Sequence, residues 1–288
     1  MTPAGRRPNE AARAARAVVI PALVSLVTAS CGPALLKLPA GPRMPATDAA
    51  AVIDQATAAC RSISTITLEM SVRGSVGGQR LRGRLSAGLA KPASARLEAL
   101  ASLGQPVFFF VATDADATVY MPRDQRVAHG RPEALLEAVA GVPLDGSSLR
   151  SVVTGCANMP NAPAMQAIGD DWRVTSDSSD EVYFRRDQAI RSWRLAATVA
   201  SRLRFAASPS TAVKNSTWRA EYSNFQSGLP RTIHLVSTPA GRFDLQLELS
   251  QVELNVPLGP EVFQVQVPAS AETIGVDELR RSGPLGGK

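Results

Sequence analysis

The chain is poor in the residue types that build most catalytic and metal centres. It has 3 Cys and 2 His among its 288 residues, and the two histidines, His129 and His234, lie far apart in the sequence. Neither stands in a zinc-binding spacing such as H-E-x-x-H. The sequence also lacks a G-x-S-x-G elbow, a P-loop and a dinucleotide-binding fingerprint. We therefore expect no catalytic residue, no metal ion and no cofactor, which favours a binding protein over an enzyme.

Clustered positive charge is scarce as well. Only four of the 31 basic residues are Lys, and the arginines are spread through segments with a strand-like pattern. A nucleic-acid-binding protein needs a basic patch that neutralises several phosphates. The acidic pair Asp114 and Asp116 lacks the glycine and the distal glutamate of an EF-hand loop, so it is better interpreted as part of a turn. We expect no nucleic-acid partner.

The apolar run near the N-terminus is too short to span a membrane as a helix. It covers residues 17–29, whereas a spanning helix needs roughly 20 residues, and Pro21 interrupts it. A segment with four arginines and one glutamate precedes it. A basic segment followed by a short apolar one is typical of a signal peptide, to which we assign residues 1–30.

The end of this run, Thr28-Ala29-Ser30-Cys31, resembles the lipobox of bacterial lipoproteins, although that motif usually has Leu where this chain has Thr28. The resemblance implies that Cys31 is lipidated and anchors the protein to a membrane. Gly32, rather than Asp, follows it, which by the same resemblance favours the outer membrane, on its periplasmic side. The alternative is an ordinary signal peptide that is cleaved nearby, with Cys31 left as a free thiol or a disulfide partner.

Two further cysteines, Cys60 and Cys156, remain in the exported chain. Outside the cytoplasm such a pair indicates a disulfide, which would close a loop of about 96 residues. The alternative is two separate buried thiols. We favour the bridge.

Proline and glycine mark both ends of the folded part. Residues 31–46 contain four prolines and little periodicity, which is typical of a flexible tether. Residues 271–288 end in a Gly-rich stretch, and we expect them to form a C-terminal tail. Between these segments, residues 47–270 are predicted to form a single β domain that opens with a short helix ending near Cys60.

The clearest structural pattern is a long β-hairpin. Apolar and polar residues alternate from Ile66 to Val72 and again from Leu81 to Leu89, on either side of the glycine-rich turn "GSVGG". One face of the hairpin is therefore apolar. Its other face carries the row Arg80, Arg82 and Arg84, which we interpret as a solvated strand face rather than an anion site.

A run of three phenylalanines, Phe108 to Phe110, belongs to a strand that needs cover on both sides. The segments that could supply this cover are the two short helices that follow it, one from Pro132 to Gly141 and one ending at Gly155. The chain then returns to strands. In the segment "FDLQLELSQVEL" the alternation changes phase after Leu249, which predicts a bulge near Ser250 and Gln251 or a strand end, and "VFQVQVP" predicts a final strand.

The count of about eleven to thirteen antiparallel strands and roughly three short helices predicts a mainly β (α+β) fold. We expect a strongly curved antiparallel sheet, an incomplete β-barrel whose concave face is plugged by the short helices. Such a sheet would explain the phenylalanine strand, because the helices would cover its inner side.

The order of these elements resembles the LolA/LolB family of lipoprotein carriers. The resemblance rests on the early helix, the "GRLSAGL" strand, the helical insertion and the ending "GLPRTIHLVSTPAGRFDLQLELSQVELNVPLGPEVFQVQVP", in which Pro230, Asn255, Phe263 and Pro268 match the family's order. It implies an apolar cavity, closed by helices, that binds acyl chains of a lipid or a lipoprotein.

We interpret apolar residues on the inward side of the strands and on the covering helices as the cavity wall. A well-filled core would show the same alternation. The alternative function is thus a structural or assembly lipoprotein that contacts other envelope proteins. The candidate wall residues are Leu68, Met70, Leu85, Phe108, Phe110, Leu135, Leu136, Leu149, Val152, Leu245 and Leu247.

Overall fold

The computed structural model describes six stretches of the chain: residues 34–100, 105–156, 164–176, 180–200, 217–238 and 242–283. The signal peptide assigned to residues 1–30 and the lipidation candidate Cys31 lie outside them. Residues from Leu36 onward form one compact unit. None of the helices in the described stretches is long and apolar enough to cross a bilayer.

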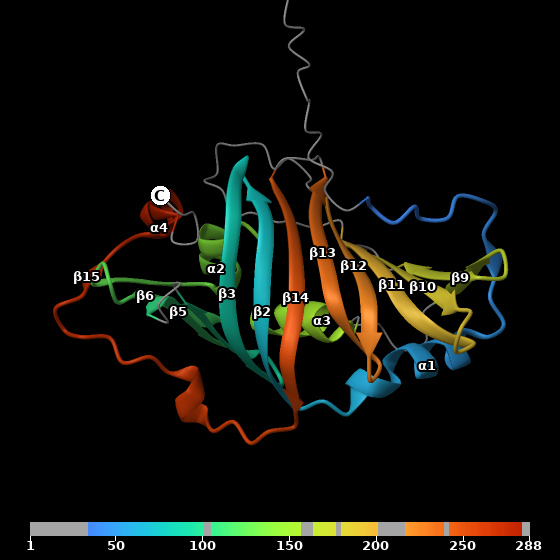
Figure 1. Cartoon of the computed structure of the whole chain (residues 1–288), viewed down its shortest axis with the longest axis horizontal. Helices are drawn as coiled ribbons and strands as arrows, with labels where there is room; N and C mark the ends of the chain where they lie inside the picture. Colours follow the sequence, from blue (N-terminus) through green and yellow to red (C-terminus); the bar gives the residue numbers. More distant parts are fainter. Residues whose placement is uncertain are drawn as a thin grey trace, which may run out of the picture. The chain divides into compact units, whose positions relative to one another are not determined.

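The unit is built on one open sheet, to which the described stretches contribute fifteen strands (Figure 1). Their order is β1-β8-β9-β10-β11-β12-β13-β14-β2-β3-β4-β5-β6-β7-β15. Neighbouring strands are antiparallel, except that β15 runs parallel to β7. The bounds are β1 Met44–Pro45, β2 Thr65–Val76, β3 Gln79–Ala90, β4 Ser94–Leu100, β5 Pro106–Thr113, β6 Asp116–Met121, β7 Arg126–Gly130, β8 Met165–Ile168, β9 Trp172–Ser176, β10 Asp180–Asp187, β11 Ser192–Ala200, β12 Thr217–Gln226, β13 Leu229–Thr238, β14 Phe243–Leu254 and β15 Glu272–Thr273.

Short helices lie against this sheet, and local chemistry sets their ends. Pro132 begins α2, where its missing N–H costs nothing, and the Asp145 carboxylate caps α3 by accepting a hydrogen bond from the Ser148 N–H. Gly141 and Gly155 end these two helices in the left-handed conformation, with φ of 75° and 64°. The bounds are α1 Ala49–Arg61, α2 Pro132–Ala140, α3 Gly146–Thr154, η1 Pro260–Phe263 and α4 Val276–Ser282.

Three helices cover the inner, concave face of the sheet. Helix α1 lies on β11, α2 on β6 and β7, and α3 reaches both β13 and the β3–β4 pair (Figure 1). Every second side chain of the central strands points toward them, so one hydrophobic cluster joins helices and sheet. The predicted fold class is therefore confirmed: the sheet is curved, antiparallel apart from one short edge pair, and left open rather than closed into a barrel.

The predicted β-bulge is also confirmed. The register between β14 and β2 shifts between Ser250 and Glu253, and Gln251 adopts a positive φ of 49°. The extra residue explains why the alternation changes phase after Leu249. The hairpin between β2 and β3 turns at Gly77 and Gly78, whose φ angles of 57° and 80° suit glycine.

The phenylalanine strand is covered on both sides, as expected. Phe110 faces the helices and is fully buried, whereas Phe109 faces outward and stacks on Tyr120 with ring centroids 6.5 Å apart. The Arg96 guanidinium lies 5.1 Å from the Phe109 ring and donates hydrogen bonds to the carbonyls of residues 262 and 264. The outer cover is thus the segment that follows β14, whereas the sequence suggests the two helices after the phenylalanine strand for both sides.

The prediction of a final strand over "VFQVQVP" is wrong. This segment forms η1 and then an extended path without strand pairing, and η1 lies against β4 and β5. Both sides of β14 are already bonded, to β13 and to β2, so no sheet edge is open beside it. Phe263 is buried on the outer face instead.

The structure also differs from the expected limits of the domain. In the expected tether, the Leu36 N–H donates to both carboxylate oxygens of Glu221, and β1 pairs with β8. In the expected tail, β15 pairs with β7, and α4 packs on α2 with Leu279 fully buried. These segments carry apolar residues that cover surfaces of the sheet. We therefore extend the folded domain to residues 36–283.

Candidate ligand cavity and rim pocket

All eleven candidate wall residues lie in the hydrophobic cluster between the sheet and the helices. Their exposed fractions range from 0 to 6%. The candidate residues on strands belong to β2, β3, β5 and β14, and those on helices belong to α2 and α3. Leu247 stands opposite Val72, and Leu249 opposite Met70, so β14 and β2 present adjacent apolar rows.

The layer that covers these rows is thin. Two helices of nine residues each, α2 and α3, contribute Leu135, Leu136, Leu149 and Val152 to the cluster. No second sheet packs on the inner face in the described stretches. An apolar sheet face under short helices is an arrangement in which acyl chains could replace helix contacts with equivalent apolar contacts.

A disulfide joins two of the covering helices. Cys60 lies in the last turn of α1, Cys156 comes just after the end of α3, and their Cα atoms are 5.7 Å apart. Both residues contact the hydrophobic cluster. The C-terminal ends of α1 and α3 are therefore held together, whereas α2 carries no such link.

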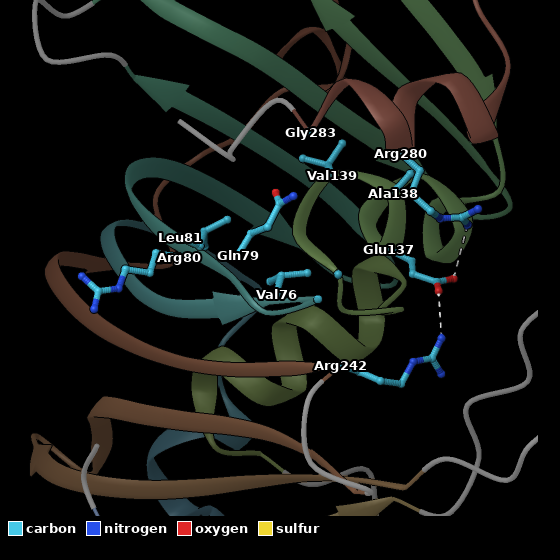
Figure 2. Close-up of a pocket in the computed structure, with 12 residues that line it drawn as sticks. Val76, Gln79, Arg80, Leu81, Glu137, Ala138, Val139, Arg242, Arg280 and Gly283 are labelled. Atoms are coloured by element: carbon cyan, nitrogen blue, oxygen red, sulfur yellow. Dashed lines mark ion pairs between the residues drawn. The ribbon is translucent and has the colours of Figure 1, made fainter. Parts of the chain in front are cut away.

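A pocket of about 410 Å³ opens at the rim of the sheet, beside α2 (Figure 2). It lies where the tip of the β2–β3 hairpin, the second half of α2, the residue before β14 and the end of α4 meet. None of the candidate wall residues lines it. Its lining is Val76, Gly77, Gln79, Arg80, Leu81, Glu137, Ala138, Val139, Gly141, Arg242, Arg280 and Gly283.

Charge in this pocket centres on Glu137 of α2. Arg242 and Arg280 approach its two carboxylate oxygens at 3.6 and 4.0 Å, from opposite sides (Figure 2). The Glu137 side chain is only 16% exposed. Burial raises the pKa of this carboxyl above its usual value, and the two arginines oppose that shift.

Sequence reasoning missed this pocket. Glu137, Arg242 and Arg280 belong to three segments that are distant in the sequence, and no spacing rule links them. Arg80, interpreted from the sequence as part of a solvated row, does line the pocket, but its guanidinium points away from Glu137 in Figure 2. The one signal in the sequence was an acidic residue in the middle of the apolar helix "PEALLEAVAG".

Each histidine contacts a polar side chain on the neighbouring strand. His234 on β13 lies 2.7 Å from the Asp244 carboxylate on the adjacent β14, and His129 lies 3.0 Å from the Thr118 hydroxyl on β6. The described stretches contain no group of three or more His, Cys, Asp or Glu that could hold a metal ion.

No protein-family model matches the chain, and no curated protein matches it in sequence. Among solved structures, it is similar to a LolA superfamily protein of Nitrosomonas europaea, with 12% identity, a TM-score of 0.50, and coverage of 75% of this chain and 97% of that one. A lipoprotein-sorting protein domain of Vibrio parahaemolyticus, described as putative, matches at 11% identity over 72% and 92% of the chains, with a TM-score of 0.37. The lipoprotein LppX of Mycobacterium tuberculosis matches at 14% identity over 74% and 99%, with a TM-score of 0.30.

Proposed function

We propose that this chain is a non-enzymatic carrier that binds the acyl chains of a lipid or a lipoprotein between its curved sheet and its short helices. The observation that carries the proposal is the continuous apolar inner face under a thin helical cover. The LolA-like fold, seen at a TM-score of 0.50, supports it. Acyl chains need apolar contacts rather than polar groups, and this face supplies them.

The way in would pass beside α2. This helix is not tied by the disulfide, and its C-terminal end rests on the tip of β2, where a Cβ added to Gly141 would lie 2.3 Å from Val76. Moving α2 would expose Leu135 and Leu136 together with the inner face of the sheet. Apolar surface exposed in this way is stable only when a ligand replaces the helix, which suits a carrier.

The same proposal places the protein in the bacterial cell envelope. Cys31 would carry the lipid anchor, at the outer membrane and facing the periplasm. The lipobox-like Thr28–Cys31 and the basic and apolar segments before it support this location. Partners would be the membrane and an acylated ligand, with contacts to envelope proteins during delivery.

Native mass spectrometry tests the proposal directly. We would purify the full chain from a bacterial envelope in mild detergent and record spectra before and after delipidation. A covalent anchor stays on the protein, whereas a bound ligand of lipid mass dissociates. We expect such a ligand, lost on extraction and regained when phospholipid or an acylated peptide is added.

A matched pair of variants locates the ligand. Met70→Trp enlarges a side chain on the inner face, whereas Ser71→Trp enlarges the exposed neighbour on the other face. Met70→Trp should lower ligand occupancy, whereas Ser71→Trp should not. Thermal unfolding of both variants should remain cooperative. An apo spectrum that does not change when lipid or acylated peptide is added would overturn the carrier and favour a protein that acts through envelope contacts.

A further inference from the structure

The rim pocket combines charges of both signs at a fixed geometry. Arg242 precedes β14, Arg280 lies on α4, and both guanidinium groups flank the carboxylate of Glu137 on α2. At 3.6 and 4.0 Å these contacts are ion pairs that are longer than hydrogen bonds. Arg280 also donates to the Asp277 carboxylate at 2.7 Å. The rim therefore places two guanidinium groups and one carboxylate a few ångströms apart.

Part of the lining of the same pocket is apolar. Val76, Leu81 and Val139 line it, and Leu81 and Val139 are members of the hydrophobic cluster that holds the candidate wall residues. A molecule seated here would have its polar end among the three charged side chains. Its apolar end would lie at the edge of the cluster, where α2 meets the tip of β2.

This arrangement matches the chemistry of a zwitterionic headgroup. A phosphate diester carries one negative charge that pairs well with guanidinium groups, and a primary ammonium two carbons further on pairs with a carboxylate. An anionic headgroup that ends in an uncharged group such as glycerol would pair with the arginines but would bring no cation to the Glu137 carboxylate. The volume of the pocket, about 410 Å³, falls within the range of small-ligand sites.

We propose that the rim pocket binds the headgroup of an amine-bearing phospholipid, with its phosphate at Arg242 and Arg280 and its ammonium at Glu137. This inference rests on the proposed function, because the acyl chains of the same lipid would occupy the inner face. It goes further by naming the headgroup class and by making Glu137 the residue that selects it.

The test is competition between two lipids of equal chain length. The full chain, delipidated in detergent, is titrated with phosphatidylethanolamine and phosphatidylglycerol, and the bound species are quantified by native mass spectrometry. We expect a preference for phosphatidylethanolamine of about tenfold, the value of one charge-assisted hydrogen bond. Glu137→Gln should abolish this preference without preventing lipid binding.

Matched controls lie on the same helices. Glu133→Gln changes an acidic residue one turn earlier on α2 that does not line the pocket, and it should leave the preference intact. Arg280→Gln should weaken the binding of both lipids about tenfold. Arg281→Gln changes an exposed neighbour outside the pocket lining and should leave the binding of both lipids unchanged.

Acidity supplies an independent readout. The charged groups that line the pocket around Glu137 are Arg242 before β14, Arg280 on α4 and Arg80 on β3, and Asp277 on α4 pairs with Arg280. Because burial raises the pKa of Glu137, the preference should disappear on acidification at a higher pH than for an exposed Glu. The Glu137→Gln variant should show no such transition.

The possible failures are distinct. Equal binding of both lipids by the natural chain would overturn the headgroup proposal and leave the carrier intact. Absence of any bound lipid would overturn both. Calorimetric titration with free phosphoethanolamine distinguishes a lipid headgroup from a small soluble ligand of the same chemistry. If phosphoethanolamine binds as tightly as the lipid, the pocket is assigned to a small soluble ligand instead.

Discussion

The two faces of the sheet are buried in different ways. The inner face is apolar along all its central strands and lies under α1, α2 and α3. The outer face is exposed at its centre, where Arg80, Arg82 and Arg84 follow β3. Among the described segments, residues 36–46 cover one flank of this face, beside β8 to β12, and residues 255–264 cover the other, beside β3 to β5.

The difference shows that two mechanisms bury a sheet face. On the inner face, apolar side chains at every second position recruit helices through nonspecific burial. On the outer face, a charged side chain fixes the backbone of each crossing segment: Glu221 accepts from the Leu36 N–H, and Arg96 donates to the carbonyls of residues 262 and 264. Polar hydrogen bonds to backbone give these crossings a defined position.

The largest loss of stability should come from removing the disulfide that joins α1 and α3 on the inner face. Replacing Cys60 and Cys156 together by Ser should lower the free energy of unfolding by about 4.5 kcal/mol, because the bridge closes a loop with a sequence separation of 96 residues. Urea denaturation of the natural chain with and without reductant measures the same quantity. Equal stability in both conditions would show that the link adds nothing to the cover of the inner face.

Two adjacent phenylalanines compare the faces directly. Phe110→Ala, on the inner face, should lower the free energy of unfolding by about 4 kcal/mol, since the side chain is fully buried. Phe109→Ala, on the partly buried outer side, should cost about 1–2 kcal/mol. Chemical denaturation of both variants makes the measurement. A larger loss for Phe109 would contradict the assignment of the faces.

The flank of the outer face has its own anchor. Phe263→Ala should cost about 3 kcal/mol, because this side chain is 7% exposed although it belongs to a segment without strand pairing. Val265→Ala, two residues further along and only half-buried, is the matched control and should cost less than about 1 kcal/mol. Similar losses for both would mean that the crossing segment is held by its hydrogen bonds rather than by burial.

The smallest effect concerns the start of α1. The Arg173 guanidinium donates to both carboxylate oxygens of Asp48, at 2.8 and 3.0 Å, and holds the pKa of Asp48 below its usual value. Asp48→Asn should cost about 1–2 kcal/mol at neutral pH. The exposed pair of Asp54 with Arg61 provides the control, since Asp54→Asn should cost less than about 0.5 kcal/mol.

The sign of the pH dependence follows from the lowered pKa. Asp48 stabilises the fold at every pH above its unfolded-state value near 3.8, and this contribution is lost as the pH falls through the lower folded-state value. The stability difference between the natural chain and Asp48→Asn should therefore be constant at neutral pH and shrink below about pH 4. Thermal unfolding of both proteins across this range checks it.

Local features of the sequence determined most of the elements. Alternation specified the β2–β3 hairpin and its inward face, Pro132 and two glycines specified the helix ends, and the phase change after Leu249 specified the bulge. Each of these depends on a residue and its near neighbours, so the amino-acid types suffice. The number of strands and short helices predicted the open sheet and its helical cover, and the resemblance to the LolA/LolB family added the expected apolar cavity.

The tertiary structure alone decided which surfaces the remaining segments cover and which charges meet. The segment around Phe263 has the alternation of a strand, yet it crosses the outer face because both sides of β14 are already paired. Glu137, Arg242 and Arg280 meet only because α2, α4 and the tip of the β2–β3 hairpin converge at the rim. Alternation predicts which side of a strand is apolar. The surface that a distant segment covers exists only after the sheet has curved and its edges are paired, so the strand's own sequence does not specify it.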